Sequence, residues 1–146
     1  MLDERVLVRH DAPMIDSVTY VPLSDIGMER EENQDYQGHD VTPHGFAFIV
    51  ADGMGGHAGG ATASQMAVNS IKRSLHNTDL ADPGELLEHA ICCANEAIYD
   101  LSQKREDLRG MGSTVVSILL QDDKAWFAHV GDSRIYRTRS GKLEQL

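Results

Sequence analysis

The sequence predicts an α+β fold in which antiparallel β-sheets are flanked by helices. Strand-like segments lie before and after two consecutive helical segments, and short turns join the strand pairs. The 146 residues are enough for one domain, or part of one, with a sizeable buried core. We find no internal repeat or low-complexity tract in the sequence. The expected architecture is a globular domain rather than a repeat array.

The first extended segment is expected near the N-terminus. Residues 1–18 mix charges with Pro13 and show no clear period, so we interpret them as an N-terminal extension or a poorly ordered edge strand. "TYVPLSDIG" then predicts a strand from Thr19 to Ile26. Pro22 favours an edge position, because proline has no N–H to donate to a neighbouring strand.

A hairpin is predicted from "DYQGHD" and "FAFIVAD", which flank the turn sequence "VTPHG". The segment from Phe46 to Ala51 is continuously apolar and rich in aromatic and branched side chains. Such a run indicates a strand that is covered on both faces, as in a layered sandwich.

Two helices are predicted in the middle of the chain. Apolar residues recur at helical spacing from Gly60 to Leu75. A second helix is expected to begin after Asp82, whose side chain can cap it. Pro83 would occupy the first helical position, and Glu85 completes a pattern like a capping box.

The C-terminal third predicts strands again. "STVVSILLQ" and "KAWFAHVGDS" flank the two residues Asp122 and Asp123 and indicate a hairpin. "RIYRT" and "KLEQL" predict two further strands around the turn "RSG".

Composition excludes several classes of function. The chain has 13 Lys and Arg against 23 Asp and Glu, a formal net charge of −10, which disfavours binding to nucleic acid or to an anionic membrane. No run approaches the ~20 apolar residues that span a bilayer. Cys92 and Cys93 match neither a zinc motif nor a disulfide framework. We expect both cysteines in the core of a reduced, cytoplasmic protein.

Two acids point to a metal site. Pairing the predicted hairpin around Pro43 and His44 places Asp35 directly opposite Asp52, and like charges so placed repel unless a cation lies between them. Carboxylates suit Mg²⁺ or Mn²⁺ better than zinc, and the Gly53 carbonyl is a further oxygen ligand. A register shifted by one residue would put the acids on opposite faces. The alternative interpretation is that Asp35 and Asp52 are turn or cap residues.

The glycine-rich stretch after Asp52 allows a different interpretation. Gly53, Gly55 and Ala58 fit the dinucleotide-binding pattern G-x-G-x-x-[G/A] between a strand and a helix. Asp52 would then place a negative charge beside the pyrophosphate, and no G-K-[ST] follows for a P-loop. Nucleotide binding therefore remains a minor alternative.

Four motifs together resemble one family. "SDIGMEREENQD", "VADGMGGHAGGATAS", "GMGSTVV" and "HVGDSRIYR" occur in the order seen in the metal-dependent Ser/Thr protein phosphatases, the PPM or type 2C family, in its bacterial form. The resemblance implies a four-layer α-β-β-α sandwich of two antiparallel sheets flanked by helices. It also implies a binuclear Mg²⁺ or Mn²⁺ centre that activates water for direct hydrolysis of phosphoserine and phosphothreonine.

Site residues follow from the resemblance by motif. It implies that Asp52 bridges two metals, that Asp35 and the Gly53 carbonyl bind the second, and that Asp132 helps to hold a third, weaker metal. The resemblance also implies that Arg30 binds phosphate through its guanidinium fork and that His57 protonates the leaving group or orders water. The implied partners are phosphorylated Ser/Thr proteins, the substrates of a Ser/Thr kinase.

The family's later aspartates, in motifs like "SDGL" and "DN", have no counterpart in this sequence. We therefore interpret residues 19–146 as an incomplete PPM-type phosphatase domain that lacks its C-terminal motifs, truncated on that side of the sandwich. Besides an active phosphatase, this leaves a non-catalytic phosphoprotein- or kinase-binding fragment and the nucleotide-binding protein as alternatives.

Overall fold

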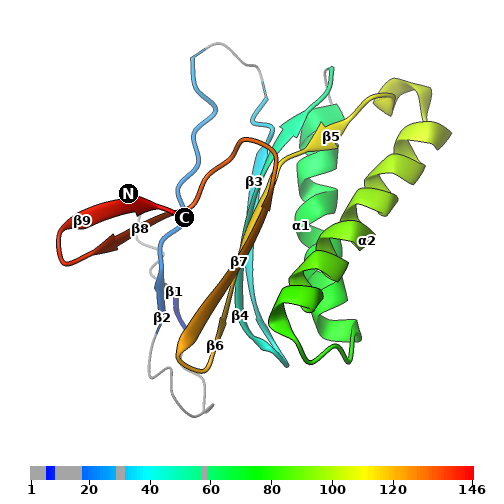
Figure 1. Cartoon of the computed structure of the whole chain (residues 1–146). Coiled ribbons are helices and arrows are strands. Elements are labelled where there is room, and N and C mark those ends of the chain that lie inside the picture. The colour runs from blue at the N-terminus through cyan, green and yellow to red at the C-terminus, as the bar shows by residue number, and fades with distance from the viewer. Residues whose placement is uncertain (1–5, 9–17, 29–31, 57–58) are drawn as a thin grey trace.

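The computed structural model describes residues 6–8, 18–28, 32–56 and 59–146. Its principal sheet is antiparallel and has the strand order β3-β4-β6-β7, with β5 paired to the end of β4 (Figure 1). The strands are β3 (Asp35–Thr42), β4 (Gly45–Met54), β5 (Gly112–Ser113), β6 (Val115–Gln121) and β7 (Lys124–Val130). The α+β class with antiparallel sheets is therefore confirmed.

Both predicted hairpins of this sheet form in the expected register. In the first, Asp35 is the partner of Asp52 and Thr42 is the partner of Gly45, which leaves Pro43 and His44 in the turn. In the second, Gln121 pairs with Lys124 across a two-residue turn. Short loops set the register of such hairpins, and the strand signals on either side are therefore enough to align them.

Two helices cover one face of the principal sheet (Figure 1). They are α1 (Gly59–Asn77) and α2 (Pro83–Lys104), and a short 3₁₀ turn, η1 (Glu106–Leu108), follows. At the start of α2 the Asp82 carboxylate accepts a hydrogen bond from the Glu85 N–H, and Pro83 stands in the first turn. The predicted cap is confirmed, because aspartate satisfies an N–H that has no partner within the helix.

The core lies between these helices and the sheet. Alternate residues of β4 and β6 face the helices, and the apolar stripes of both helices meet them. The buried side chains include Ala47, Ile49, Ala51, Val68, Ile71, Leu75, Leu86, Leu87, Ala90 and Leu119. Helix α1 lies close to β3, since a Cβ built on Gly38 would stand 2.6 Å from Val68 Cγ1. Burial of this set supplies the main hydrophobic stabilisation of the fold.

The opposite face of the sheet is covered only in part. Two short ladders lie on this side, β1 (Val6–Val8) with β2 (Val18–Tyr20) and β8 (Tyr136–Arg139) with β9 (Lys142–Gln145) (Figure 1). The ring of Tyr20 packs at centroid distances of 4.9 Å from His39 and 5.1 Å from Phe48. This layer is where the predicted sandwich would place its second sheet.

The structure corrects three expectations. The strand expected from Thr19 to Ile26 ends at Tyr20, two residues before Pro22, which cannot donate to a ladder. The run from Phe46 to Ala51 is not covered throughout on both faces, because Val50, which faces away from the helices, is 50% exposed. Cys92 lies on the exposed face of α2 and Cys93 is half-buried, so the pair is not part of the core.

No helix in the described part of the chain is long and apolar enough to cross a membrane.

Candidate metal centre

Asp35 and Asp52 lie opposite each other at one end of the β3–β4 hairpin. By strand alternation, Asp52 points to the face that the helices leave uncovered, whereas Ala51 and Gly53 point towards α1. Both acids are exposed. Directly opposed side chains have Cβ atoms about 4.5 to 5.5 Å apart, so two carboxylates at this position repel each other in the absence of a cation.

Thr114 holds the backbone of Asp52 in place. The Asp52 N–H donates to Thr114 Oγ1 over 3.1 Å, and the Asp52 carbonyl accepts from the Thr114 N–H over 2.9 Å. The Ser113 hydroxyl donates to the same carbonyl over 3.1 Å. In the described residues, no hydrogen bond or ion pair engages the Asp52 carboxylate itself. Among the described residues, the hydrogen bonds of Asp52 are therefore made by its backbone.

Thr114 also connects Asp52 to the turn that carries Asp132. The hydroxyls of Thr114 and Ser133 lie 2.7 Å apart and form a hydrogen bond. Gly131 has φ +94°, and a Cβ built there would stand 2.8 Å from Thr114 Cγ2, so glycine is needed for this approach. The two neighbours of Asp132 in the chain therefore contact one threonine, which in turn binds Asp52.

Gly53 brings the end of β4 against the start of α1. Its N–H donates to the Gln34 carbonyl over 3.0 Å. A Cβ at this position would stand 1.9 Å from the Gly60 carbonyl oxygen and 2.8 Å from that of Gln34. Glycine is therefore required here for packing, and the same packing sets the position of the backbone next to Asp52.

The structure brings together some of the predicted site residues and not others. Asp35 and Asp52 are paired, and Gly53 is buried beside them. Asp132 is exposed, and within the described ranges no group of three or more His, Cys, Asp or Glu side chains is close enough to hold a metal ion. Arg30 and His57 lie outside the described residues. What the structure supplies is thus a two-carboxylate site with Asp132 tethered nearby.

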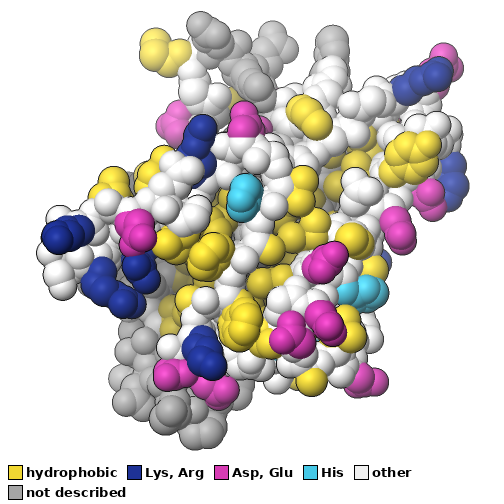
Figure 2. All heavy atoms as spheres, viewed as in Figure 1, with side chains coloured by type: hydrophobic (Ala, Val, Ile, Leu, Met, Phe, Trp, Pro, Cys, Tyr) yellow, Lys and Arg dark blue, Asp and Glu magenta, His cyan; other side chains and the backbone are white. Residues whose placement is uncertain are grey.

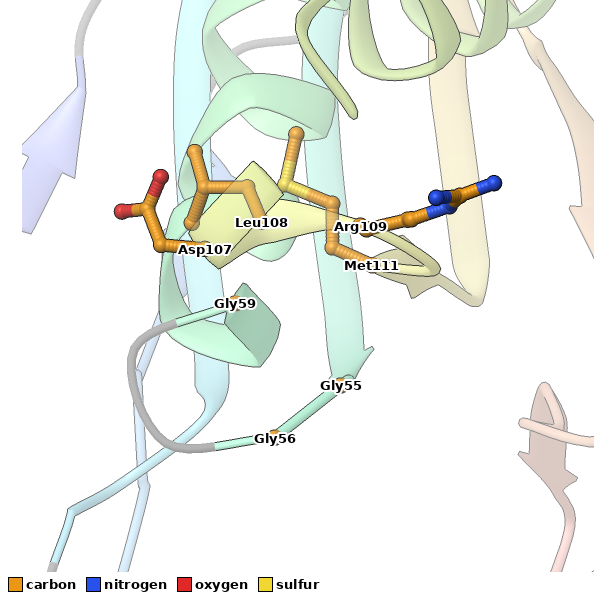
Figure 3. Close-up of a pocket in the computed structure, with 7 residues that line it drawn as sticks. All are labelled: Gly55, Gly56, Gly59, Asp107, Leu108, Arg109 and Met111. Atoms are coloured by element: carbon orange, nitrogen blue, oxygen red, sulfur yellow. The ribbon is translucent and has the colours of Figure 1, made fainter. Parts of the chain in front are cut away.

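A hollow of about 350 Å³ lies beside the glycine loop that follows Asp52. One wall is formed by Gly55, Gly56 and Gly59, and the other by Leu108, Met111 and two charged residues, Asp107 and Arg109. Figure 3 shows the side chains of Asp107 and Arg109 pointing to opposite sides, away from the glycine wall. The described lining of the hollow therefore combines three glycines with two apolar and two charged residues.

The surroundings of two groups, Asp107 and Tyr20, shift their pKa values. The Arg105 guanidinium donates to the Asp107 carboxylate, with Nε 3.1 Å from Oδ1, and this hydrogen bond lowers the pKa of Asp107. On the uncovered face of the sheet, burial raises the pKa of the Tyr20 phenol, which donates a hydrogen bond to Gln37. Both groups keep their usual charge at neutral pH.

Thr114, Gly131 and Ser133 lie within the sequence motifs, but the sequence predicted no role for them. Gln34 was likewise missed, although its carbonyl binds Gly53 and its side-chain amide donates to the Gly55 carbonyl over 3.4 Å. The sequence does show Thr114 directly before a buried strand, in "GST", and Ser133 directly after Asp132, in "GDS". Nothing in either motif shows that the two hydroxyls meet.

Replacing Thr114 by valine is expected to lower the free energy of unfolding by about 1 kcal/mol, because the Asp52 N–H then loses its hydrogen-bond acceptor. Valine keeps the shape of threonine and removes only the hydroxyl. Urea denaturation of Thr114→Val and of Thr114→Ser measures the effect, and serine should restore most of the loss. Loss of stability in Thr114→Ser but not in Thr114→Val would show that the methyl group rather than the hydroxyl matters.

The comparisons with known proteins agree on one family. A family profile described as Protein phosphatase 2C matches residues 28–146. The chain is 40% identical over 128 residues to the protein phosphatase PhpP of Streptococcus pneumoniae, covering 85% of this chain and 52% of PhpP. It is 36% identical over 132 residues to the serine/threonine protein phosphatase PstP of Mycobacterium tuberculosis, covering 87% of this chain and 24% of PstP.

Solved structures show the same similarity. The M. tuberculosis phosphatase PstP superposes with a TM-score of 0.75 at 34% identity, over 85% of this chain and 51% of that chain. A second structure, of the PstP catalytic domain in complex with two manganese ions, also has a TM-score of 0.75 at 34% identity, over 85% of this chain and 52% of that chain. The present chain spans about half the length of PhpP and of these solved chains.

Proposed function

The chain belongs to the protein phosphatase 2C family, and on that premise we propose that it contributes the β3–β4 part of a metal-dependent phosphatase site. The substrates would be proteins phosphorylated on serine or threonine. The single observation that carries the proposal is the register that sets Asp35 opposite Asp52 at the strand ends. By name, PhpP is a protein phosphatase and PstP is a serine/threonine protein phosphatase, which supports the same reaction class.

The donor set at this position fits a hard divalent cation. Two exposed carboxylates face each other on one side of the hairpin and carry oxygen ligands of the kind that Mn²⁺ and Mg²⁺ prefer. We propose that Asp52, Asp35 and the Gly53 carbonyl hold two such ions and that Asp132 contributes to a weaker third one. PstP has been solved with two manganese ions, which is consistent with that number. Bound cations would supply positive charge to phosphoryl oxygens and acidify a water molecule.

Other residues of the chain would bind the phosphate, supply a proton and position Asp52. Arg30 would bind the phosphoryl oxygens through two parallel N–H donors and so orient the phosphate. His57 would hold the proton that the departing serine or threonine oxygen needs. The backbone of Asp52, fixed by Thr114, would keep its carboxylate in one position throughout.

A second candidate function is binding of phosphoproteins without turnover. It is favoured by one observation: the described part of the chain groups two acids rather than three or more. Such a site would retain Arg30 as its phosphate ligand. Because the chain belongs to the protein phosphatase 2C family, we do not propose nucleotide binding as its function.

We propose further that the partner enzymes are Ser/Thr kinases and that the protein acts in the cytoplasm. The formal net charge of −10 disfavours nucleic acids and anionic membranes as partners.

Phosphate release from a phosphothreonine peptide is expected to require MnCl₂ and to stop when the metal is chelated. Release would be measured as inorganic phosphate, with binding of the same peptide followed by fluorescence anisotropy. Arg30→Ala should weaken peptide binding, whereas the matched control Arg73→Ala, on α1, should not. Binding without release would favour the second candidate, and neither binding nor release would contradict both.

A further inference from the structure

The β8–β9 hairpin separates two kinds of side chain onto its two faces. The register pairs Arg137 with Glu144 and Arg139 with Lys142. Because strand side chains alternate, these four residues share one face. The other face carries Tyr136, Thr138, Leu143 and Gln145. Every residue of both strands is exposed, with Leu143 at 70% and Tyr136 at 53%. Apolar groups lie on the second face, so the charged face is the one suited to remain in water.

The segment that contains this hairpin carries a net positive charge, whereas the rest of the chain carries a net negative charge. Residues 134–146 contain four Lys and Arg and one acid, whereas residues 1–133 contain the other nine Lys and Arg and 22 Asp and Glu. Figure 2 shows Lys and Arg side chains gathered over β8 and β9, at the left of the view. A local basic surface therefore stands on an otherwise acidic protein.

The cations of this face are not all neutralised within the hairpin. The Arg137 guanidinium lies 2.5 Å from the Glu144 carboxylate and forms an ion pair across the strands. Arg139 faces Lys142 next to the turn at Ser140 and Gly141, and no ion pair in the described residues engages either side chain. Like charges directly opposite each other are unfavourable, and an anion placed between them would relieve the repulsion.

The size of the basic face limits what can bind to it. Four residues of extended strand are about 13 Å long, which matches about four residues of an extended peptide. A long polyanion or a flat bilayer would also meet the acidic remainder of the protein and be repelled by it. A short run of carboxylates meets only the hairpin.

From these observations we propose that the face formed by Arg137, Arg139, Lys142 and Glu144 is a docking surface for a short acidic segment of a partner protein. Carboxylates of that segment pair with Arg139 and Lys142, and the Arg137–Glu144 pair marks the end of the surface. The proposal goes beyond the phosphatase site, because this binding needs neither a phosphate nor a metal ion.

The test uses fluorescein-labelled peptides of eight glutamates and of eight glutamines, with the full chain in metal-free buffer. We expect the glutamate peptide to bind more tightly, and Arg139→Gln/Lys142→Gln to weaken it about fivefold or more, given the usual strength of two exposed charge pairs. Binding should also weaken as salt is raised. The matched control, Arg73→Gln/Lys104→Gln on the helices, removes the same charge and should change binding less than twofold.

Three outcomes would overturn the proposal. These are equal binding of the two peptides, an equal loss in the control variant, and tighter binding of a 20-nucleotide DNA or of phosphatidylserine vesicles than of the glutamate peptide. Circular dichroism of each variant confirms that the fold is retained. Because no phosphorylated substrate is used, a negative result here is separate from failure of the phosphatase assay.

Discussion

Replacing Asp52 by asparagine is expected to abolish the stabilisation of this chain by Mn²⁺. A ligand that binds only the folded state at 100 times its dissociation constant raises the free energy of unfolding by about 2.7 kcal/mol, and the variant should lose this gain. Asparagine matches aspartate in size but cannot supply a charged oxygen to the site. Chemical denaturation with and without MnCl₂ measures the difference.

Without metal, the same substitution is expected to raise the free energy of unfolding rather than lower it. Asp35 and Asp52 are direct partners in the β3–β4 ladder, so removal of one charge removes a repulsion of about 0.2 to 1 kcal/mol. Asp52→Asn is therefore expected to be at least as stable as the unaltered chain in metal-free buffer. Asp122→Asn, in the β6–β7 turn, is the control for a general change of charge. If Asp52→Asn kept the full manganese effect, the metal assignment would be wrong.

Replacing Gly53 by alanine is expected to destabilise the chain by about 3 kcal/mol or more. The new methyl group would meet the carbonyl oxygens of Gly60 and Gln34 at 1.9 and 2.8 Å, and both belong to the backbone. Neither can turn aside as a flexible side chain would. The end of β4 must therefore separate from the start of α1, which disturbs the position of Asp52.

Gly56→Ala is the matched control for this prediction. Within the described residues, a Cβ at Gly56 would meet no atom within 4 Å, so the substitution should change the free energy of unfolding by less than about 0.5 kcal/mol. Thermal and urea unfolding of the two variants measure the contrast. Similar stability of Gly53→Ala and Gly56→Ala would contradict the close packing of β4 on α1.

The strand pairing that forms the site could be predicted because its determinants are local. A turn at Pro43 and His44 leaves one favourable register for the flanking strands, and that register places Asp35 opposite Asp52. The cap at Asp82 is likewise encoded within four residues. Both features depend on backbone geometry that short segments adopt with little help from the rest of the chain.

The link between Asp52 and the Asp132 turn could not be predicted in this way. Thr114 is 62 residues from Asp52 and 19 from Ser133, so the contacts depend on the order of strands in the sheet. The incomplete cover of Val50 was also missed, because an apolar run indicates what a strand can bury and not which layer is present to bury it.

The sequence by itself determined the antiparallel pairs, the two helices, the Asp82 cap of the second helix, and the opposition of Asp35 and Asp52, because local periodicity and turn chemistry encode them. Only the tertiary structure decided that Thr114 joins Asp52 to the neighbour of Asp132, that Gly53 must admit the Gly60 carbonyl, and that Cys92 is exposed. These depend on which distant segments pack together. Packing is settled by the burial of the whole core rather than by any one segment.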